Sequence, residues 1–315
     1  MPHHRYHRVD GFLVGKHFTA PTMREVFAYE PRPDDIFIVT YPKCGTTWAQ
    51  HIVFYILNHG NPPKSPEEFE SKTPFFELKG QAAVEGLVRP AAIKTHLPFD
   101  RQPYSKDAKY IYVTRNPFDC CVSFYHHVKM LPLYDFDDGT FGEFFEDFIK
   151  GEVDFGDYFD HLLSWYPHRN DPNVLFLTYE DLKKDVRTWI QKMADFLGNE
   201  YGDELRADPS ILERIVEFTS LDAMKKVVNP AMQSMGQRFT GVPVEVLPPW
   251  AQRLVEDCGD LLKKPFVGEF VRKGQVGGSR SYFTAEQVRR MKEWIAKRTA
   301  GSDVMNLWKD MKFAD

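Results

Sequence analysis

The sequence predicts an α/β protein: a single domain, residues 1–315, with a central parallel sheet flanked by helices. Short apolar runs rich in β-branched and aromatic residues recur along the chain, and most lead into a helical pattern. A chain of 315 residues that is 43% hydrophobic and 15% aromatic can bury one large core. We find no repeat or low-complexity segment, and the Pro-rich stretches 30–35 and 60–68 are too short to separate domains.

Four buried strands are expected, at residues 36–40, 91–95, 109–114 and 173–179. After the third, Pro117 stands at the first position of a helix that Asn116 caps. After the fourth, a period of 3.6 residues runs from Leu182 to Leu197 and ends at Gly198. Strands that alternate with helices form a parallel sheet, and ligands bind beyond the carboxyl ends of its strands.

Charge and hydropathy narrow the classes of partner. A formal net charge of −5 argues against a protein that coats nucleic acid or an anionic membrane. No apolar stretch reaches 18 residues, and the polar N-terminus lacks the apolar segment of a signal peptide. We therefore expect a cytoplasmic protein with no nucleic-acid or membrane partner.

The cysteine and histidine pattern predicts no metal site. The four cysteines lack the spacing of a zinc site or a disulfide framework and are expected to be reduced thiols. The neighbours Cys120-Cys121 and His126-His127 lie on a predicted helix, where adjacent side chains diverge by about 100° and seldom chelate together. The N-terminal histidines are expected on a solvated tail; they are His3, His4 and His7.

The segment TYPKCGTTW, residues 40–48, lies between the first strand and a helix. A loop that turns at Gly45 presents backbone N–H groups and a helix N-terminus to an anion, while Lys43 adds charge. A Walker A loop would place Lys after a second Gly, and here Lys43 precedes the only one. The segment therefore predicts a P-loop-like anion cradle without the Walker signature of a metal-dependent NTPase.

This segment resembles T-Y-P-K-S-G-T-T-W, the phosphosulfate loop of cytosolic sulfotransferases. Near the other end, FVRKGQVGGSRSYFT, residues 270–284, is similar to that family's F-x-R-K-G-x-x-G-D-W-K-x-x-F-T segment. Further similar segments lie in order between them, so the resemblance covers nearly the whole chain. They are KTHLP (94–98), YVTRNPFDCCVSFYHH (112–127), GEVDFGDYFDHLLSWY (151–166), YEDLKKD (179–185) and TSLDAMKK (219–226).

The resemblance implies transfer of a sulfuryl group from 3′-phosphoadenosine 5′-phosphosulfate (PAPS) to a hydroxyl or amine of a small acceptor, without a metal. It implies that the 43–47 loop holds the 5′-phosphosulfate and that Lys43 neutralises charge on the bridging oxygen. His96 would be the general base, because an imidazole suits proton transfer near neutral pH. The implied catalytic set is His96, Lys43, Lys94 and Ser123.

The resemblance also implies how the nucleotide is held. Arg115, Ser123 and the segment 272–274 would bind the 3′-phosphate, and Trp48 and Tyr179 would flank the adenine. Taken alone, Trp48 could be core and Arg115 could pair with a nearby Asp119 instead. The implied cofactor-binding residues are Lys43, Cys44, Gly45, Thr46, Thr47, Trp48, Arg115, Ser123, Tyr179, Thr219, Met224, Phe270, Arg272, Lys273 and Gly274.

The resemblance places the acceptor site near TPFFELKG (73–80), the Tyr125-His126 region and LPLYDFDDGTF (131–141). Aromatic walls suit a phenolic ring. The acidic residues in the second segment either attract a phenolic amine or belong to a solvated loop. The candidate substrate residues are Phe75, Phe76, Leu78, Lys94, His96 and Phe136, and the acids are Asp135, Asp137 and Asp138.

Three departures from the family pattern lead to expectations of their own. Where the family has G-D-W-K, residues 277–280 read GGSR, which predicts a looser cofactor lid. The family's dimer motif K-x-x-x-T-V-x-x-x-E here starts with Arg280 and ends with Arg289, so a monomer is expected. Cys44 replaces a Ser, and at a helix N-terminus beside Lys43 its thiol should be reactive unless it is simply buried.

Two other functions fit parts of the pattern. A small-molecule or nucleotide kinase of P-loop type would share the fold and the phosphate loop but would require Mg²⁺. A non-catalytic nucleotide-binding protein is the second alternative, against which the Lys43, Lys94 and His96 set argues.

Overall fold

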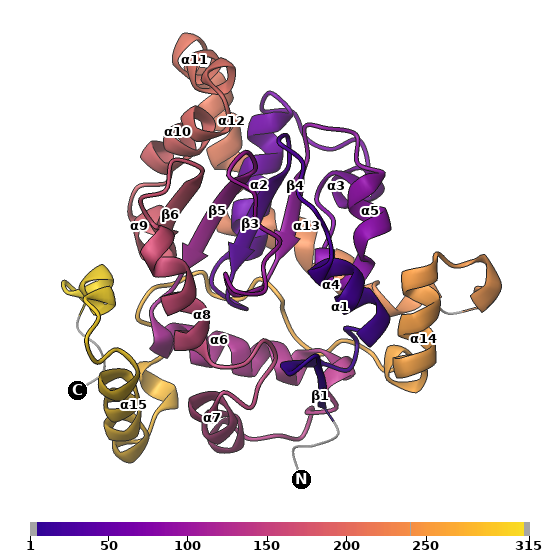
Figure 1. Cartoon of the computed structure of the whole chain (residues 1–315), viewed down its shortest axis with the longest axis vertical. Helices are drawn as coiled ribbons and strands as arrows, with labels where there is room; N and C mark the ends of the chain where they lie inside the picture. Colours follow the sequence, from indigo (N-terminus) through magenta and orange to yellow (C-terminus); the bar gives the residue numbers. More distant parts are fainter. Residues whose placement is uncertain (1–4, 240, 312–315) are drawn as a thin grey trace.

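The computed structural model describes residues 5–239 and 241–311, and at its centre lies a parallel sheet (Figure 1). Its four strands are β3 (Ile36–Thr40), β4 (Ala92–Thr95), β5 (Lys109–Thr114) and β6 (Val174–Thr178), in the spatial order β4-β3-β5-β6. All three pairings are parallel. The α/β class is thus confirmed, and the expected strands agree with the observed ones to within one residue at each end.

Helices cover both faces of the sheet. Successive side chains of a strand point to opposite faces, and in β3 the side chains on both faces are buried. In β3, Ile36 and Ile38 belong to one hydrophobic cluster, and Phe37 and Val39 belong to another. The helices packed with the first pair are α2 (Thr46–Leu57), α3 (Pro66–Lys72), α9 (Tyr179–Lys184), α10 (Val186–Leu197), α11 (Asn199–Ala207) and α12 (Pro209–Phe218). Those packed with the second pair are α1 (Ala20–Phe27), α4 (Phe76–Lys79), α5 (Gln81–Glu85), α6 (Pro117–Met130), α7 (Phe141–Lys150), α8 (Tyr158–Trp165) and α15 (Ala285–Arg298).

Two further helices lie outside these layers. Helix α13 (Leu221–Gln233) follows α12, and α14 (Pro249–Leu262) packs on Leu133 through Leu254 and Cys258. In Figure 1, α14 stands out at the side of the molecule. No helix in the described part of the chain is long and apolar enough to cross a membrane.

Helix starts follow the sequence signals, with one difference. Pro117 opens α6, and the Asn116 side chain accepts a hydrogen bond from the backbone N–H of Asp119 (2.9 Å). The apolar period expected to form one helix from Leu182 to Leu197 is divided between α9 and α10. Asp185 ends the first helix and caps the second, so the apolar stripe continues although the helix does not.

The N-terminal segment is a β-hairpin, where a solvated tail was expected. Strands β1 (Tyr6–Val9) and β2 (Phe12–Gly15) pair antiparallel, and apolar side chains on both are buried in the core. His7 lies in β1, with its Nε2 2.9 Å from the carbonyl oxygen of Phe18. The expectation for His7 was therefore wrong, whereas His3 and His4 lie outside the described residues.

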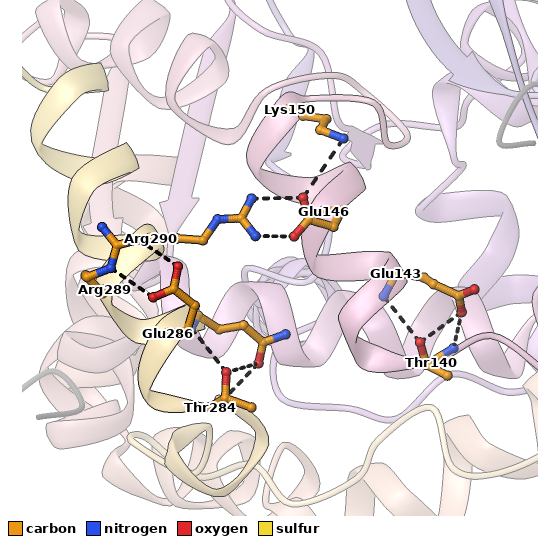
Figure 2. A network of polar contacts seen from close by, with 9 residues as sticks. Thr140, Glu143, Glu146, Lys150, Thr284, Glu286, Arg289 and Arg290 are labelled. Atoms are coloured by element: carbon orange, nitrogen blue, oxygen red, sulfur yellow. Dashed lines mark hydrogen bonds and ion pairs between the residues drawn. The ribbon is translucent and has the colours of Figure 1, made fainter.

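Figure 2 shows how α15 is joined to α7. Arg290 donates to both carboxylate oxygens of Glu146, which also lies 4.0 Å from Lys150 Nζ. Each of the two helices begins with a capping box, formed by Thr140 on α7 and Thr284 on α15. The segment after the predicted lid is thereby attached to the core of the molecule.

Candidate active site

The sheet register gathers the predicted site residues at one edge. Val39 pairs with Thr95, and Thr114 pairs with Thr178, so parallel strands end side by side. The 43–47 loop, His96, Arg115 and Tyr179 each follow one of these strand ends. The topology therefore brings four sequence-distant segments together, as expected for a doubly covered parallel sheet.

The 43–47 loop has the backbone geometry of an anion cradle. Lys43 (φ 69°) and Gly45 (φ 109°) both adopt left-handed conformations, and Gly45 is the N-cap of α2. A Cβ on Gly45 would lie 2.9 Å from the Tyr179 ring, so only glycine fits here. The loop delivers the chain into α2, whose first N–H groups and positive end are available to a phosphate.

Lys43 and Lys94 supply an excess of positive charge. Each ammonium lies 4.0 Å from the centre of an aromatic ring, that of Phe270 for Lys43 and that of Phe75 for Lys94. Burial, with the charges of Lys94 and Arg115, lowers the pKa of Lys43 to about 7. Burial lowers the pKa of Lys94 to about 8. Clustered cations with depressed pKa values are stabilised by an anion placed between them.

His96 is buried, and one of its ring nitrogens is already committed. Its Nδ1 lies 2.8 Å from the Thr40 carbonyl oxygen, which can only accept, so Nδ1 carries the proton. The lone pair is then on Nε2. Burial and the Lys94 charge lower the pKa of His96 well below its ordinary value, so the ring is neutral. The Thr40 hydroxyl also lies 2.6 Å from the Thr46 hydroxyl, which links His96 to the phosphate loop.

Glu77, which the sequence interpretation missed, holds the His96 segment in place. One carboxylate oxygen accepts hydrogen bonds from the backbone N–H of His96 and from the Thr95 hydroxyl (2.9 Å). The other oxygen is buried without a partner in the described part of the structure. Burial raises the pKa of Glu77 to about 7. In the sequence, the position of Glu77 inside the otherwise apolar run PFFEL is the signal that could have marked it as a buried, functional acid.

Arg115 lies where a second anion would be held. Its Nη2 donates to the Gln275 carbonyl oxygen (3.0 Å) and lies 3.7 Å from Asp119, and the guanidinium stacks 4.5 Å above Tyr179. The Asp119 alternative is thus present as an ion pair. Among residues 5–239 and 241–311, Arg115 Nε is nevertheless buried without a hydrogen-bond partner. Ser123 lies two turns into α6, the helix that follows Arg115.

The 272–274 segment is fixed beside α13 by a residue the sequence interpretation did not mark. Asn229 exchanges two hydrogen bonds with the backbone of Val271, of 2.8 and 3.2 Å. Gly274 takes a left-handed conformation (φ 56°). Farther along, the backbone N–H of Gly277 donates to Asp119 (2.7 Å). These bonds, with the one from Arg115, hold the segment at the start of α6 although the family's acid and tryptophan are missing.

Trp48 and Tyr179 lie together on the other side of the loop. Their rings meet edge to face with centroids 5.5 Å apart, and Trp48 Nε1 is buried without a hydrogen-bond partner in the part of the chain that the structure describes. Thr219 ends α12 and donates its hydroxyl hydrogen to the Ile215 carbonyl oxygen (2.7 Å). Met224 is buried in the first turn of α13. The Trp48 and Tyr179 rings thus form an edge-to-face aromatic pair next to the anion cradle.

The structure separates two neighbours that were both expected to line the acceptor site. Phe75 meets the His96 ring edge to face (5.2 Å) and carries the Lys94 ammonium on its face. Phe76 is fully buried and packs against Tyr29 and Phe37 in the core. The wall role expected for Phe76 is therefore corrected to a core role, because the chain changes at this point from the extended Phe75 to the first turn of α4, which turns Phe76 into the core.

The remaining acceptor candidates lie farther out. Leu78 packs with the Leu133 and Leu254 cluster under α14. Phe136 is buried against Tyr125 and Phe144, with the Arg5 guanidinium 4.3 Å from its ring centre. Neither lies in the immediate ring contacts of His96 as Phe75 does.

The acidic residues near Phe136 form a solvated loop. Asp135, Asp137 and Asp138 are all exposed, and Asp135 pairs with Lys264 (2.8 Å). Of the two interpretations that the sequence allowed, the solvated loop agrees with this geometry. An attraction for amine acceptors therefore has no support from these acids.

Cys44 differs from the reactive thiol that was expected. Its side chain is fully buried, and its Sγ lies 3.7 Å from Cys120 Sγ on α6. Burial and the Cys120 contact raise the pKa of the Cys44 thiol well above its ordinary value. The expected lowering by the helix N-terminus and Lys43 was wrong, because the side chain turns into the core and not toward the loop.

Within residues 5–239 and 241–311, no group of three His, Cys, Asp or Glu side chains could hold a metal ion. His126, one of the vicinal histidines, has its Nε2 2.8 Å from the Tyr282 hydroxyl. The unpaired buried donors on Arg115 and Trp48, with the two lysines, fit an anionic nucleotide. Fold and site together define an α/β protein with a site suited to such a nucleotide.

Comparison with known proteins identifies the family. The model of the sulfotransferase domain matches residues 33–240, so the chain belongs to the sulfotransferase family. Sulfotransferase 1E1 of Bos taurus is 35% identical over 266 residues, which are 81% of this chain and 80% of the relative. Sulfotransferase 1C2 of Homo sapiens is 32% identical over 306 residues, 94% and 93% of the two chains.

A solved structure agrees over almost the full length. The crystal structure of mouse sulfotransferase SULT7A1, complexed with PAP, superposes with a TM-score of 0.71 at 27% identity. The match covers 97% of this chain and 98% of the mouse chain.

Proposed function

We propose that this protein transfers a sulfuryl group from PAPS to the hydroxyl group of a small aromatic acceptor. The observation that carries the proposal is the hydrogen-bonded path from His96 through Thr40 to Thr46, which joins a neutral imidazole to the phosphate loop. The PAP bound to the mouse relative supports the choice of nucleotide. The acceptor class follows from the aromatic ring of Phe75 beside His96.

The donor supplies the sulfuryl group, and its bond from sulfur to the bridging phosphate oxygen breaks as the acceptor oxygen bonds to sulfur. His96 Nε2 takes the proton from the acceptor hydroxyl, because Nδ1 is already protonated toward Thr40. Lys43 stabilises the charge that develops on the leaving phosphate oxygen, and Lys94 stabilises the sulfuryl oxygens. Glu77 keeps the His96 backbone in position during these steps.

The nucleotide is held by residues on both sides of the loop. The backbone N–H groups of residues 45–47 and the Thr47 hydroxyl bind the 5′ end. Arg272, Lys273 and Ser123 bind the 3′-phosphate, together with the unpaired Nε of Arg115. Trp48 and Tyr179 flank the adenine, and Thr219, Met224 and Phe270 complete the nucleotide site.

Replacement of His96 tests the proposed base. His96→Ala should lower kcat for a phenolic acceptor by about 10²-fold or more, because the acceptor proton loses its base. Affinity for PAP, measured by calorimetry, should remain close to that of the parent protein and serves as the folding control. Turnover near the parent value in a variant that binds PAP normally would contradict the role of His96.

A further inference from the structure

Two imidazoles that the proposed reaction does not use have unsatisfied nitrogens. His17 follows β2 and is 6% exposed, and His127 lies on α6 and is partly buried. In each, Nδ1 is buried without a hydrogen-bond partner among the described residues. Unpaired polar atoms of this kind are rare in protein interiors and frequently mark a place where water or a ligand binds.

Both imidazoles border the same tyrosine. The Tyr134 ring meets His17 at 5.0 Å and His127 at 5.8 Å, in both cases edge to face. The Tyr134 hydroxyl donates to Asp154 (2.6 Å), which also accepts from the backbone N–H of Gly15. Tyr134 and Asp154 are therefore occupied with each other, and His17 Nε2 lies 4.0 Å from Asp154 Oδ2, while the two Nδ1 atoms have no partner among the described residues.

Aromatic contacts connect His17 to His96, the proposed base. The His96 ring meets Phe155 at 5.2 Å, and Phe155 meets Phe18 at 5.1 Å. Phe18 in turn packs on His17 at 4.2 Å. A series of ring contacts thus connects the unsatisfied His17 with the ring of His96.

A second series of contacts connects His127 to Lys43 in the phosphate loop. The His127 ring meets Phe270 at 5.6 Å, and the Phe270 ring carries the Lys43 ammonium at 4.0 Å. His17 and His127 thus lie between the two groups that would act on the acceptor and on the leaving phosphate.

The charges around the two imidazoles disfavour a cationic ligand. Burial lowers the pKa of His17 to about 3, and burial with the Lys43 and Lys94 charges lowers that of His127 well below its ordinary value. Both rings are therefore neutral. Asp154 is the acid beside them, and burial raises its pKa to about 7. A neutral imidazole donates through one nitrogen and accepts through the other, which suits an uncharged hydroxyl.

We infer that His17 and His127 form an acceptor subsite that hydrogen-bonds a second, uncharged polar group of the acceptor. The preferred substrates are then hydroxyaromatic compounds that carry a further hydroxyl group away from the one that is sulfated. The inference rests on the proposed sulfuryl transfer and names its substrate class. A protonated amine at the same position is a poor substitute, because Lys43 and Lys94 repel it and neither imidazole neutralises it.

Matched acceptors of equal size test this subsite. In the single-ring set, 4-propylphenol, 4-(2-hydroxyethyl)phenol and 4-(2-aminoethyl)phenol differ only in a terminal methyl, hydroxyl or ammonium group. A second set of acceptors, built on biphenyl with the same three terminal groups, places the terminal group farther from the hydroxyl that is sulfated. In at least one set kcat/KM should be about tenfold higher for the hydroxyl compound than for the other two, as expected for one buried hydrogen bond.

Variants separate hydrogen bonding from ring packing. His127→Phe and His17→Phe should reduce the hydroxyl preference severalfold toward the value for the methyl compound, with kcat/KM for the methyl compound and PAP affinity little changed. His127→Asn, whose amide lies near the position of Nδ1, should restore part of the preference. His126→Phe, a change to the neighbouring histidine that bonds Tyr282, is the matched control and should leave the preference intact.

Three results would overturn the subsite. They are a wild-type preference for the methyl or ammonium compound, equal losses for all acceptors in the two Phe variants, and an equal loss in the His126 control. Absence of sulfuryl transfer to every acceptor, in protein that binds PAP, would instead contradict the proposed function. The two failures are therefore distinguishable.

Discussion

The charge on Lys43 should make nucleotide binding depend on pH. In the free protein its pKa is about 7, and that of Lys94 is about 8. A bound phosphate favours the protonated lysine and raises its pKa, so binding takes up a proton wherever the free lysine is neutral. Affinity for PAP is therefore highest at and below neutral pH and falls as pH rises through the free-state pKa values.

The magnitude follows from linkage. Above its free pKa, each lysine lowers affinity by about tenfold per pH unit until the bound-state pKa is reached. Between pH 7 and pH 9, Lys43 alone should weaken PAP binding by about fifty-fold, and Lys94 should add about tenfold. Arg115 and Arg272 are the other cations that lower the Lys43 pKa.

Isothermal calorimetry at pH 7, 8 and 9, in two buffers of different ionisation enthalpy, measures both the affinity and the proton uptake. The Lys43→Arg variant keeps its positive charge at all three pH values. Its PAP affinity should therefore lose the part of the pH dependence that Lys43 causes. Lys297→Arg, at an exposed position of α15, is the control and should behave as the parent. Equal affinity at pH 7 and pH 9, or an unchanged slope in Lys43→Arg, would refute the reasoning.

Four further predictions follow from the same geometry. Arg272→Ala should weaken binding of PAP by ~1.5–3 kcal/mol but hardly that of AMP, and equal weakening for both would remove Arg272 from the 3′-phosphate site. Because Cys44 is buried with a raised pKa, mass spectrometry should find it unmodified by iodoacetamide in the folded protein, and rapid alkylation would contradict its placement. Glu77→Gln, which keeps one oxygen for the His96 N–H, should retain more kcat than Glu77→Ala, and equal activity of the two in steady-state assays would exclude the positioning role. Arg289 pairs with Glu286 and Glu293 of its own helix, and light scattering at low micromolar concentration should give a monomer of about 36.7 kDa, whereas a stable mass of twice that value would disprove this.

The fold could be predicted because its strands carry a strong local signal. Residues 36–39 and 110–113 are continuous apolar runs, and a parallel sheet buries such runs on both faces. The N-terminal hairpin was missed because its strands have four residues each and β1 includes the exposed Arg8. The break at Asp185 was missed because the apolar stripe continues through it.

The location of the candidate site could be predicted for a topological reason, but its side-chain directions could not. Parallel strands end at one edge, so His96 and Arg115 had to lie near the loop. Whether Phe75 or Phe76 faces His96, and whether Cys44 faces the loop or α6, depends on packing between distant segments. The partners of His96 were missed for the same reason, because Glu77 reaches it from another element.

Sulfuryl transfer from the nucleotide is the central claim, and a radiolabelled donor measures it directly. With labelled PAPS and 4-(2-hydroxyethyl)phenol at neutral pH, we predict labelled aryl sulfate and an equal amount of PAP, at a rate that EDTA does not change. His96→Ala, checked for PAP binding, should lose this activity. No labelled product with any phenolic acceptor, or product that forms only when Mg²⁺ is added, would contradict the account.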